Sequence, residues 1–180
     1  MLGNFTYCNP TKLYFGEDSL GYLNTELPKY GQNVVLIYGG GSIKKNGVYE
    51  ELMELLKAAG KTVTEFAGIM SNPTFAKVQE GAQWARDCKA DLVLAVGGGS
   101  VIDCCKIVCA QAVTEEDLWE VEMVRHCAPT GAPIPLGAVV TASGTGAEMN
   151  GGAVITNEES KIKGGMFAAA PRFALLDPEY

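Results

Sequence analysis

Short apolar runs alternate along the chain with segments in which apolar residues recur every three or four positions. The runs are rich in β-branched and aliphatic residues, which is typical of strands buried on both faces of a parallel sheet. They occupy residues 34–38, 62–66, 92–96 and 134–140. The segments with helical periodicity occupy residues 48–60, 74–88 and 101–113. Strands alternating with helices predict an α/β fold, in which right-handed crossovers build a parallel sheet flanked by helices.

The two ends of the chain follow this alternation less closely. Near the N-terminus, NPTKLYFG (residues 9–16) predicts a short extended segment that enters the domain, with an edge hairpin as the alternative. Towards the C-terminus, runs at residues 153–156, 161–167 and 173–176 predict short strands separated by turns. No low-complexity tract or linker divides the chain, so we expect a single domain.

Composition limits the compartment and the partners. The 180 residues are 47% hydrophobic and 19% charged, their net charge is -7, and no Lys/Arg cluster is longer than a pair. We therefore expect a packed protein that binds neither nucleic acid nor an anionic membrane. The sequence shows no secretion leader and no apolar run of membrane length, which favours the cytoplasm. The six cysteines are expected to be reduced thiols without a chemical role.

Glycine-rich turns follow three of the predicted strands. GGGS occurs at residues 39–42 and again at residues 97–100, and SGTG occupies residues 143–146. Turns without side chains let an anionic ligand approach backbone N–H groups, and a helix N-terminus adds partial positive charge. Neither GGGS loop completes a Walker A or GxGxxG motif. Sharp turns between strand and helix also favour glycine, so a purely structural role stays open at this point.

The order of these turns along the chain favours ligand binding. The carboxyl ends of parallel strands lie along one edge of a sheet, so the three turns could border one extended ligand. A dinucleotide has the necessary length and phosphates. We therefore expect the three turns to surround a dinucleotide.

Four motifs together resemble the iron-containing alcohol dehydrogenases. They are GGGSVIDCCK (97–106), TASGTGAEMN (141–150), the Asn72-Pro73-Thr74 turn and FALLDPE (173–179). The first loop, YGGGSIKKNG, is similar to the NADP-preferring butanol dehydrogenase subgroup of that family. The resemblance covers essentially all 180 residues. It implies a Rossmann-like dinucleotide-binding domain, of the kind that the family shares with dehydroquinate synthase.

The resemblance also implies which residues contact the cofactor. The pyrophosphate-binding turn would be formed by Gly97, Gly98, Gly99 and Ser100, and Asp103 would face the cofactor one helical turn later. Six further contacts are implied: Asn72 near the adenosine end, Thr141 and Thr145 along the cofactor, Asn150 and Lys163 beside the nicotinamide ribose, and Tyr180 against the cofactor.

The first loop resembles the site that reads the adenosine ribose. NAD-preferring relatives carry an Asp where this chain has Gly39, and a carboxylate there would repel a 2′-phosphate. Lys44 or Lys45 would supply positive charge to that phosphate. The same phosphate would accept hydrogen bonds from Gly40, Gly41 and Ser42. We therefore expect NADP to be favoured over NAD.

This chain departs from the family in its metal ligands. The resemblance implies one Asp and three His that hold Fe²⁺ or another divalent metal in a helical second domain, and His126 is the only histidine here. We expect residues 1–180 to be the NAD(P)-binding domain, without metal or catalytic residues and without the C-terminal metal-binding domain. The full-length form would be an NADP-dependent alcohol dehydrogenase acting on a small alcohol or aldehyde. A stand-alone nucleotide-binding or regulatory module without redox activity is the alternative. The resemblance further implies a homodimer that pairs through residues 5–15.

Overall fold

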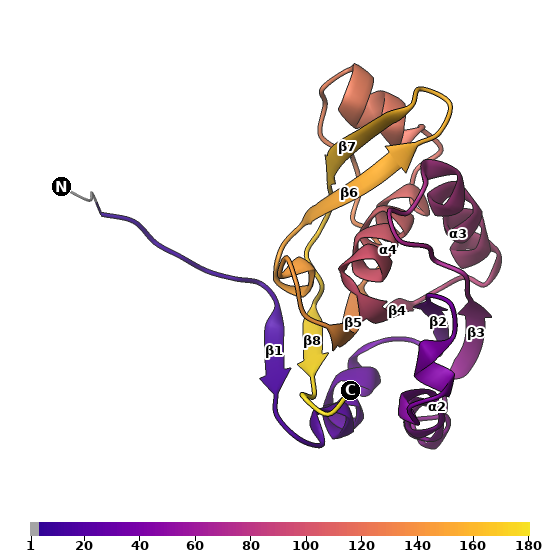
Figure 1. Cartoon of the computed structure of the whole chain (residues 1–180), viewed down its shortest axis with the longest axis vertical. Coiled ribbons are helices and arrows are strands. Elements are labelled where there is room, and N and C mark those ends of the chain that lie inside the picture. Colours follow the sequence, from indigo (N-terminus) through magenta and orange to yellow (C-terminus); the bar gives the residue numbers. More distant parts are fainter. Residues whose placement is uncertain (1–3) are drawn as a thin grey trace.

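The computed structural model describes residues 4–180, and a six-stranded parallel sheet forms its centre. The strand order is β1-β8-β5-β4-β2-β3 (Figure 1). The strands of this sheet are β1 (Lys12–Phe15), β2 (Asn33–Tyr38), β3 (Thr62–Phe66), β4 (Leu92–Gly98), β5 (Leu136–Ala142) and β8 (Phe173–Leu176). The predicted Rossmann-like α/β fold is confirmed.

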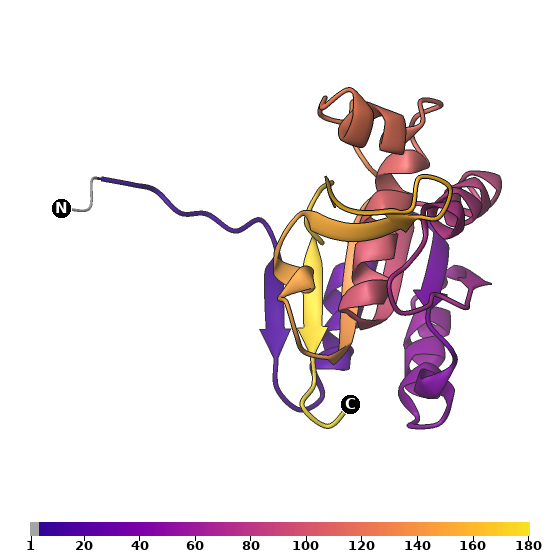
Figure 2. The same ribbon diagram turned by 45° about the horizontal axis from the view of Figure 1, so that its top comes forward.

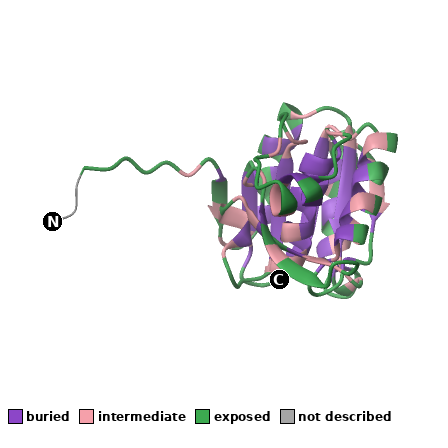
Figure 3. Cartoon of the chain, turned by 90° about the horizontal axis from the view of Figure 1, so that it is seen from above, coloured by how far each residue is buried: buried purple, intermediate pink, exposed green. Residues whose placement is uncertain are grey.

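Helices cover both faces of the sheet. The longer ones are α2 (Val48–Ala58), α3 (Phe75–Asp87) and α4 (Gly99–Gln111). The shorter ones are η1 (Ser19–Tyr22), α1 (Leu23–Glu26), η2 (Leu27–Lys29), η3 (Ser42–Lys44), η4 (Glu120–Val124, a π-helix) and η5 (Ala147–Met149). Side chains alternate along β2, so Val35 and Ile37 join the core under α3 and α4, while Val34 and Leu36 join the core under α1 and α2. Figure 3 shows the resulting buried sheet between partly exposed helices.

The strand order places the glycine turns side by side. From β2 the chain moves to β3 on one side, then returns across β2 to form β4 and β5 on the other side. The crevice of such a doubly wound sheet opens where the direction reverses, outside the carboxyl ends of the strands. Here the reversal falls between β2 and β4, the two strands that run into GGGS.

A separate antiparallel hairpin lies across α4. Its strands are β6 (Gly152–Asn157) and β7 (Ile162–Phe167). Figure 2 shows the hairpin crossing in front of α4 towards α3. The Thr156 N–H donates to the Pro73 carbonyl at 2.9 Å, which ties the far end of β6 to the turn before α3.

Several boundaries differ from the prediction. The edge hairpin is wrong: β1 pairs in parallel with β8, because the first extended segment returns to the sheet beside the last strand. β4 and β5 each continue two residues beyond the predicted ends, since Gly98 still pairs with Ala142. Consequently α4 starts at Gly99 rather than at residue 101. Thr74 caps α3 as predicted, and its hydroxyl accepts from the Lys77 N–H at 3.2 Å.

Four helical stretches were not predicted, and two of them, η3 and η5, are three-residue turns. η1, α1 and η2 follow one another over residues 19–29, and their short lengths hide the helical periodicity that longer helices show. The acidic segment after α4 contains η4, whose i to i+5 pattern has no simple sequence signature. Within residues 4–180, no helix has the length and apolar character that crossing a bilayer requires.

Candidate functional site

The three glycine turns meet at the carboxyl edge of the sheet. A Cβ placed on Gly98 would lie 3.3 Å from the Ala142 Cβ, and one on Gly99 would lie 3.6 Å from Thr145 Oγ1. The second and third turns therefore lie side by side. A Cβ on Gly39 would lie 3.8 Å from the Val101 side chain of α4. The first turn thus borders the same helix N-terminus, as the sequence predicted for turns around one ligand.

The second turn passes from strand to helix without any intervening loop. β4 ends at Gly98 and α4 begins at Gly99, so the first backbone N–H groups of a 13-residue helix point out of the sheet edge. At Gly97 a Cβ would sit 2.6 Å from Val101 Cγ2, so no larger residue fits there. This arrangement is a ready-made anion site.

Ser100 does not cap this helix. Gly98 occupies the N-cap position, and no side chain caps the helix. The reason is that the helix begins inside the glycine run, which leaves Ser100 as its second residue. Its hydroxyl and the uncapped N–H groups both stay available to a ligand.

The first turn has a different shape. Gly41 adopts a left-handed conformation with φ of 91°, and only the three-residue η3 follows before α2 starts at Val48. A side chain at Gly40 would meet nothing within 4 Å. The first GGGS is therefore an open turn rather than the N-terminus of a long helix. Lys45 is exposed beside it.

Lys44, the other lysine of this turn, belongs to a cluster that the sequence did not reveal. Its Nζ lies 3.2 Å from Glu65 Oε2 and 4.3 Å from the centre of the Tyr49 ring. The hydroxyls of Tyr38 and Tyr49 each donate to Glu65 at 2.6 Å. These hydrogen bonds hold the pKa of Glu65 below its ordinary value, and contact with Tyr38 and Glu65 raises the pKa of Lys44.

Behind the second turn, Lys106 forms a second network that was not predicted. Its side chain is fully buried in α4, and Nζ donates to the Gly152 carbonyl at 2.6 Å and to Asn150 Oδ1 at 3.2 Å. It also lies 3.4 Å from Asp103 Oδ1. Burial lowers the pKa of Lys106 from its ordinary value. This lysine therefore fastens the β6–β7 hairpin to the helix that carries the anion site.

Asp103 is engaged in the same network. Its Oδ2 accepts from the Val154 N–H at 3.0 Å, while Oδ1 faces Lys106. Asn150 lies nearby: its amide donates to the Gly146 carbonyl at 2.7 Å, which links the third turn to the hairpin. The carboxylate of Asp103 is thus shared between protein donors, and a direct contact with the cofactor stays a prediction.

Asn72 and Lys163 meet directly. Lys163 Nζ donates to Asn72 Oδ1 at 2.6 Å, across 91 positions of sequence. The two side chains therefore lie together, and their contacts with the cofactor stay a prediction. Asn72 has φ of 54°, in the left-handed region that Asn adopts more readily than most residues.

The remaining predicted contacts lie around this edge in different degrees of exposure. Thr145 is exposed on the third turn, and Thr141 is half-buried near the end of β5. Tyr180 is half-buried further along the chain, and its hydroxyl lies 3.3 Å from Glu51 Oε2 of α2.

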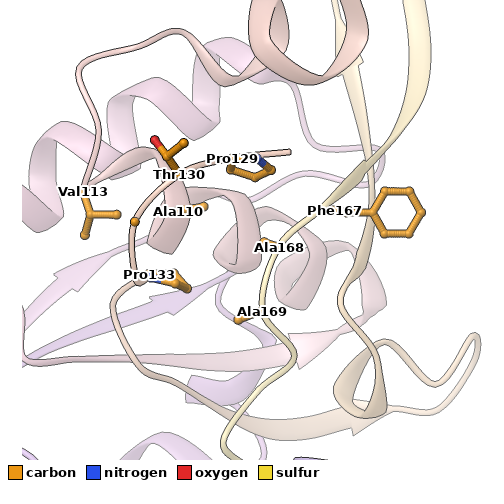
Figure 4. A pocket seen from close by; sticks show the side chains of 9 residues that line it. Ala110, Val113, Pro129, Thr130, Pro133, Phe167, Ala168 and Ala169 are labelled. Carbon is orange, nitrogen blue, oxygen red and sulfur yellow. The ribbon is translucent and has the colours of Figure 1, made fainter. Parts of the chain in front are cut away.

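A separate apolar hollow lies at the other end of α4. Its volume is about 270 Å³ (Figure 4). It is lined by Ala110, Val113, Pro129, Thr130, Gly131, Pro133, Phe167, Ala168 and Ala169. A 13-residue helix is about 20 Å long, so this hollow is well separated from the glycine turns.

Iron or another divalent metal does not fit the residues described. Over residues 4–180, no three or more His, Cys, Asp or Glu side chains are grouped so that they could hold a metal ion. Burial also raises the pKa of Cys104 to about 12, so this thiol is a poor metal ligand or nucleophile.

The fold and the meeting of three glycine turns define a nucleotide-binding α/β domain. Comparison with known proteins then gives the family. The sequence model described as "Iron-containing alcohol dehydrogenase" matches residues 10–178, and the chain belongs to that family.

The relatives are alcohol and aldehyde oxidoreductases by name. The chain is 48% identical over 177 residues to "Probable NADH-dependent butanol dehydrogenase 1" of Bacillus subtilis, covering 97% of this chain and 45% of that protein. It is 37% identical over 188 residues to "NADPH-dependent aldehyde reductase YqhD" of Escherichia coli, covering 99% and 46%. The crystal structure of NADH-dependent butanol dehydrogenase A from Thermotoga maritima superposes with a TM-score of 0.90 at 40% identity, covering 97% of this chain and 44% of that one. The chain thus spans less than half the length of these relatives.

Proposed function

We propose that residues 1–180 are the NAD(P)-binding domain of an iron-dependent alcohol dehydrogenase or aldehyde reductase. The full-length enzyme would transfer hydride between the nicotinamide and a small alcohol or aldehyde. One observation carries this proposal: the turns after β2, β4 and β5 meet at the carboxyl edge of the sheet, around the N-terminus of α4. A dinucleotide matches that edge in length and in charge.

Each element of the edge has a proposed role. The pyrophosphate binds the N–H groups at the start of α4, where the helix dipole favours negative charge. Thr141 and Thr145 contact the cofactor from the third turn. Beside the nicotinamide ribose we place Asn150 and Lys163, the latter positioned by Asn72. The chain's own residues therefore bind and orient the cofactor.

We further propose that NADP is preferred over NAD. The support is the open first turn: Gly39 carries no carboxylate, and a Cβ at Gly40 or Gly41 would meet nothing within 4 Å. Ser42 and Lys45 are exposed in the same turn and could bind a 2′-phosphate. The names of the relatives divide between the two cofactors, since the Bacillus protein is named for NADH and the Escherichia protein for NADPH. Direct measurement on this chain is therefore the test.

The metal site, on this proposal, is formed outside residues 1–180 by a second, helical domain. The support is that the family name includes iron, while the described residues offer no ligand group. The proposal also places the protein in the cytoplasm, in keeping with its six free cysteines. A homodimer is proposed through the edge strand β1 and the segment before it, where Phe5, Tyr7 and Phe15 are 80%, 78% and 72% exposed.

Fluorescence titration with NADPH and NADH tests cofactor binding. We expect both to bind, and NADPH to bind more tightly. Equal or tighter binding of NADH would contradict the proposed preference. An aldehyde-reduction assay with added Fe²⁺ or Zn²⁺ should then show no turnover by this chain alone. Metal-dependent turnover would contradict the proposal that the metal site lies elsewhere.

A substitution at Gly39 tests the first turn itself. Gly39→Asp should weaken NADPH binding by about tenfold relative to NADH, because the new carboxylate repels the 2′-phosphate. A Cβ here would lie 3.2 Å from the Ile69 carbonyl oxygen, so any side chain disturbs the turn slightly. Gly39→Asn has the same size without the charge and is the matched control. If both variants change the NADPH to NADH ratio equally, the preference does not depend on charge at this position.

A further inference from the structure

The lysine that follows the first turn is already paired with a carboxylate. Lys44 lies 3.2 Å from Glu65 Oε2, and its ammonium stands over the rings of Tyr38 and Tyr49 at 5.2 and 4.3 Å from their centres. About 43% of the Lys44 side chain and 34% of the Glu65 side chain are exposed, so the pair faces solvent beside the turn. Its two charges offset each other.

Glu65 lies beside the turn that is proposed to bind the 2′-phosphate of the cofactor. Tyr38 is the last residue of β2 and directly precedes Gly39, while Glu65 is the last but one residue of the neighbouring strand β3. In doubly wound dinucleotide-binding sheets, an acidic residue after the glycine turn accepts hydrogen bonds from the adenosine ribose. Here both carboxylate oxygens accept from tyrosine hydroxyls instead, at 2.6 Å each.

From this arrangement we infer that Glu65 is a specificity-determining residue, which lowers the preference for a 2′-phosphorylated cofactor by holding Lys44 as its counter-ion. The inference rests on the proposed function, and it deepens the assignment of the first turn. With Glu65 in place, Lys45 is the lysine of the turn whose charge is left for the phosphate. Without that carboxylate, a negative charge near the phosphate disappears and Lys44 becomes free to reach it.

The chain contains a second cluster of the same chemistry that serves as an internal control. Glu26 Oε1 accepts from the Tyr14 hydroxyl at 2.6 Å and from Lys29 Nζ at 2.7 Å. Tyr14 belongs to β1, at the opposite edge of the sheet from β3. Removing this carboxylate disturbs a tyrosine and lysine cluster of the same kind without touching the first turn.

The test measures dissociation constants of NADPH and NADH for Glu65→Gln and for Glu26→Gln. We expect Glu65→Gln to tighten NADPH binding relative to NADH by about threefold to fivefold, the size expected for exposed charges. Glu26→Gln should leave the ratio unchanged. Thermal unfolding of both variants reports whether they stay folded. A Glu65→Gln ratio equal to that of the wild-type chain, or one shifted towards NADH, would overturn the inference.

A double-mutant cycle with Lys44→Met separates recruitment of the lysine from simple loss of charge. If Glu65 holds Lys44 back, Lys44→Met costs more NADPH affinity in the Glu65→Gln background than in the wild-type chain. Equal costs in both backgrounds would show that Lys44 is not released, and would overturn the inference. The ratio of the NADPH and NADH dissociation constants of the wild-type chain tests the proposed NADP preference. The change of that ratio in Glu65→Gln tests the inference about Glu65, so the two can fail separately.

Discussion

The two GGGS loops have the same four residues and different structures. The second loop runs straight from β4 into α4, and its glycines pack against Val101, Ala142 and Thr145. The first loop leaves β2 as an open turn, and η3 separates it from α2. The residues after each tetrapeptide decide between these outcomes: a long apolar helix begins at once after the second loop, whereas IKKNG delays the helix after the first.

This difference supports the proposal that the loops bind different chemical groups of one ligand. A 13-residue helix N-terminus suits the pyrophosphate, which carries charge in any dinucleotide. An open turn beside lysines and Glu65 suits a group that varies between cofactors, because its charge is set by side chains rather than by a helix. Variants in and around each loop can test whether the loops differ in this way.

The largest effect is expected from an added methyl group in the second loop. Gly97→Ala places a Cβ 2.6 Å from Val101 Cγ2, and we expect the free energy of unfolding to fall by about 3 kcal/mol through overpacking. Gly40→Ala is the matched change in the first loop, where nothing lies within 4 Å, and its effect should stay within about 0.5 kcal/mol. Urea denaturation measures both. Equal losses would remove the structural distinction between the loops.

A smaller loss is expected at the buried lysine behind the second loop. Lys106→Met takes the lysine donor from the Gly152 carbonyl and leaves Asn150 Oδ1 with the Gly152 N–H alone, and it should lower the free energy of unfolding by about 2 kcal/mol. It should also weaken binding of nicotinamide mononucleotide more than binding of 2′-phospho-ADP-ribose, because the proposed function places the nicotinamide end beside the hairpin. Lys57→Met, at an exposed position of α2, is the control. An equal loss for both ligands would mean that Lys106 acts on the fold alone.

Acid pH should weaken the cluster beside the first loop. The pKa of Glu65 is lowered in the folded chain by Tyr38 and Tyr49, so its stabilising contribution is complete above the unfolded value near 4.3. That contribution is lost as the pH falls through the lower folded value. Because the carboxylate is part-exposed and screened by solvent, the loss should not exceed about 1 kcal/mol. Urea midpoints between pH 6 and pH 3, compared with those of Glu65→Gln, measure it. If the urea midpoints of the wild-type chain and of Glu65→Gln fell in parallel as the pH is lowered, this contribution of Glu65 would be contradicted.

The smallest effect is expected at the exposed lysine of the first loop. Lys45→Met should weaken NADPH by about threefold at low salt and leave NADH unchanged, since an exposed charge is well screened. Titrations at two salt concentrations check this, because the difference should shrink at the higher one. An equal loss of NADH affinity would mean that Lys45 supports the structure of the turn and does not bind the 2′-phosphate.

The sequence predicted the parts of the structure that depend on local patterns. The buried runs indicated the strands around Val35 and Val93, and Thr74 marked the start of α3. The clusters around Glu65 and Lys106 could not be predicted, because most of their hydrogen bonds join residues 16 to 51 positions apart, which meet only through tertiary packing. A lysine follows each GGGS loop, yet Lys44 is exposed beside its partner and Lys106 is buried.

The central claim is that the two loops bind different groups of the same ligand. Backbone amide shifts measured by NMR during titration with ADP-ribose and with 2′-phospho-ADP-ribose test it most directly, because these ligands differ only in the 2′-phosphate. Both ligands should shift the amides of Gly98, Gly99 and Ser100. Only the phosphorylated ligand should further shift those of Gly40, Gly41 and Ser42. If the added phosphate shifts the second loop instead, or shifts neither loop, the claim is contradicted.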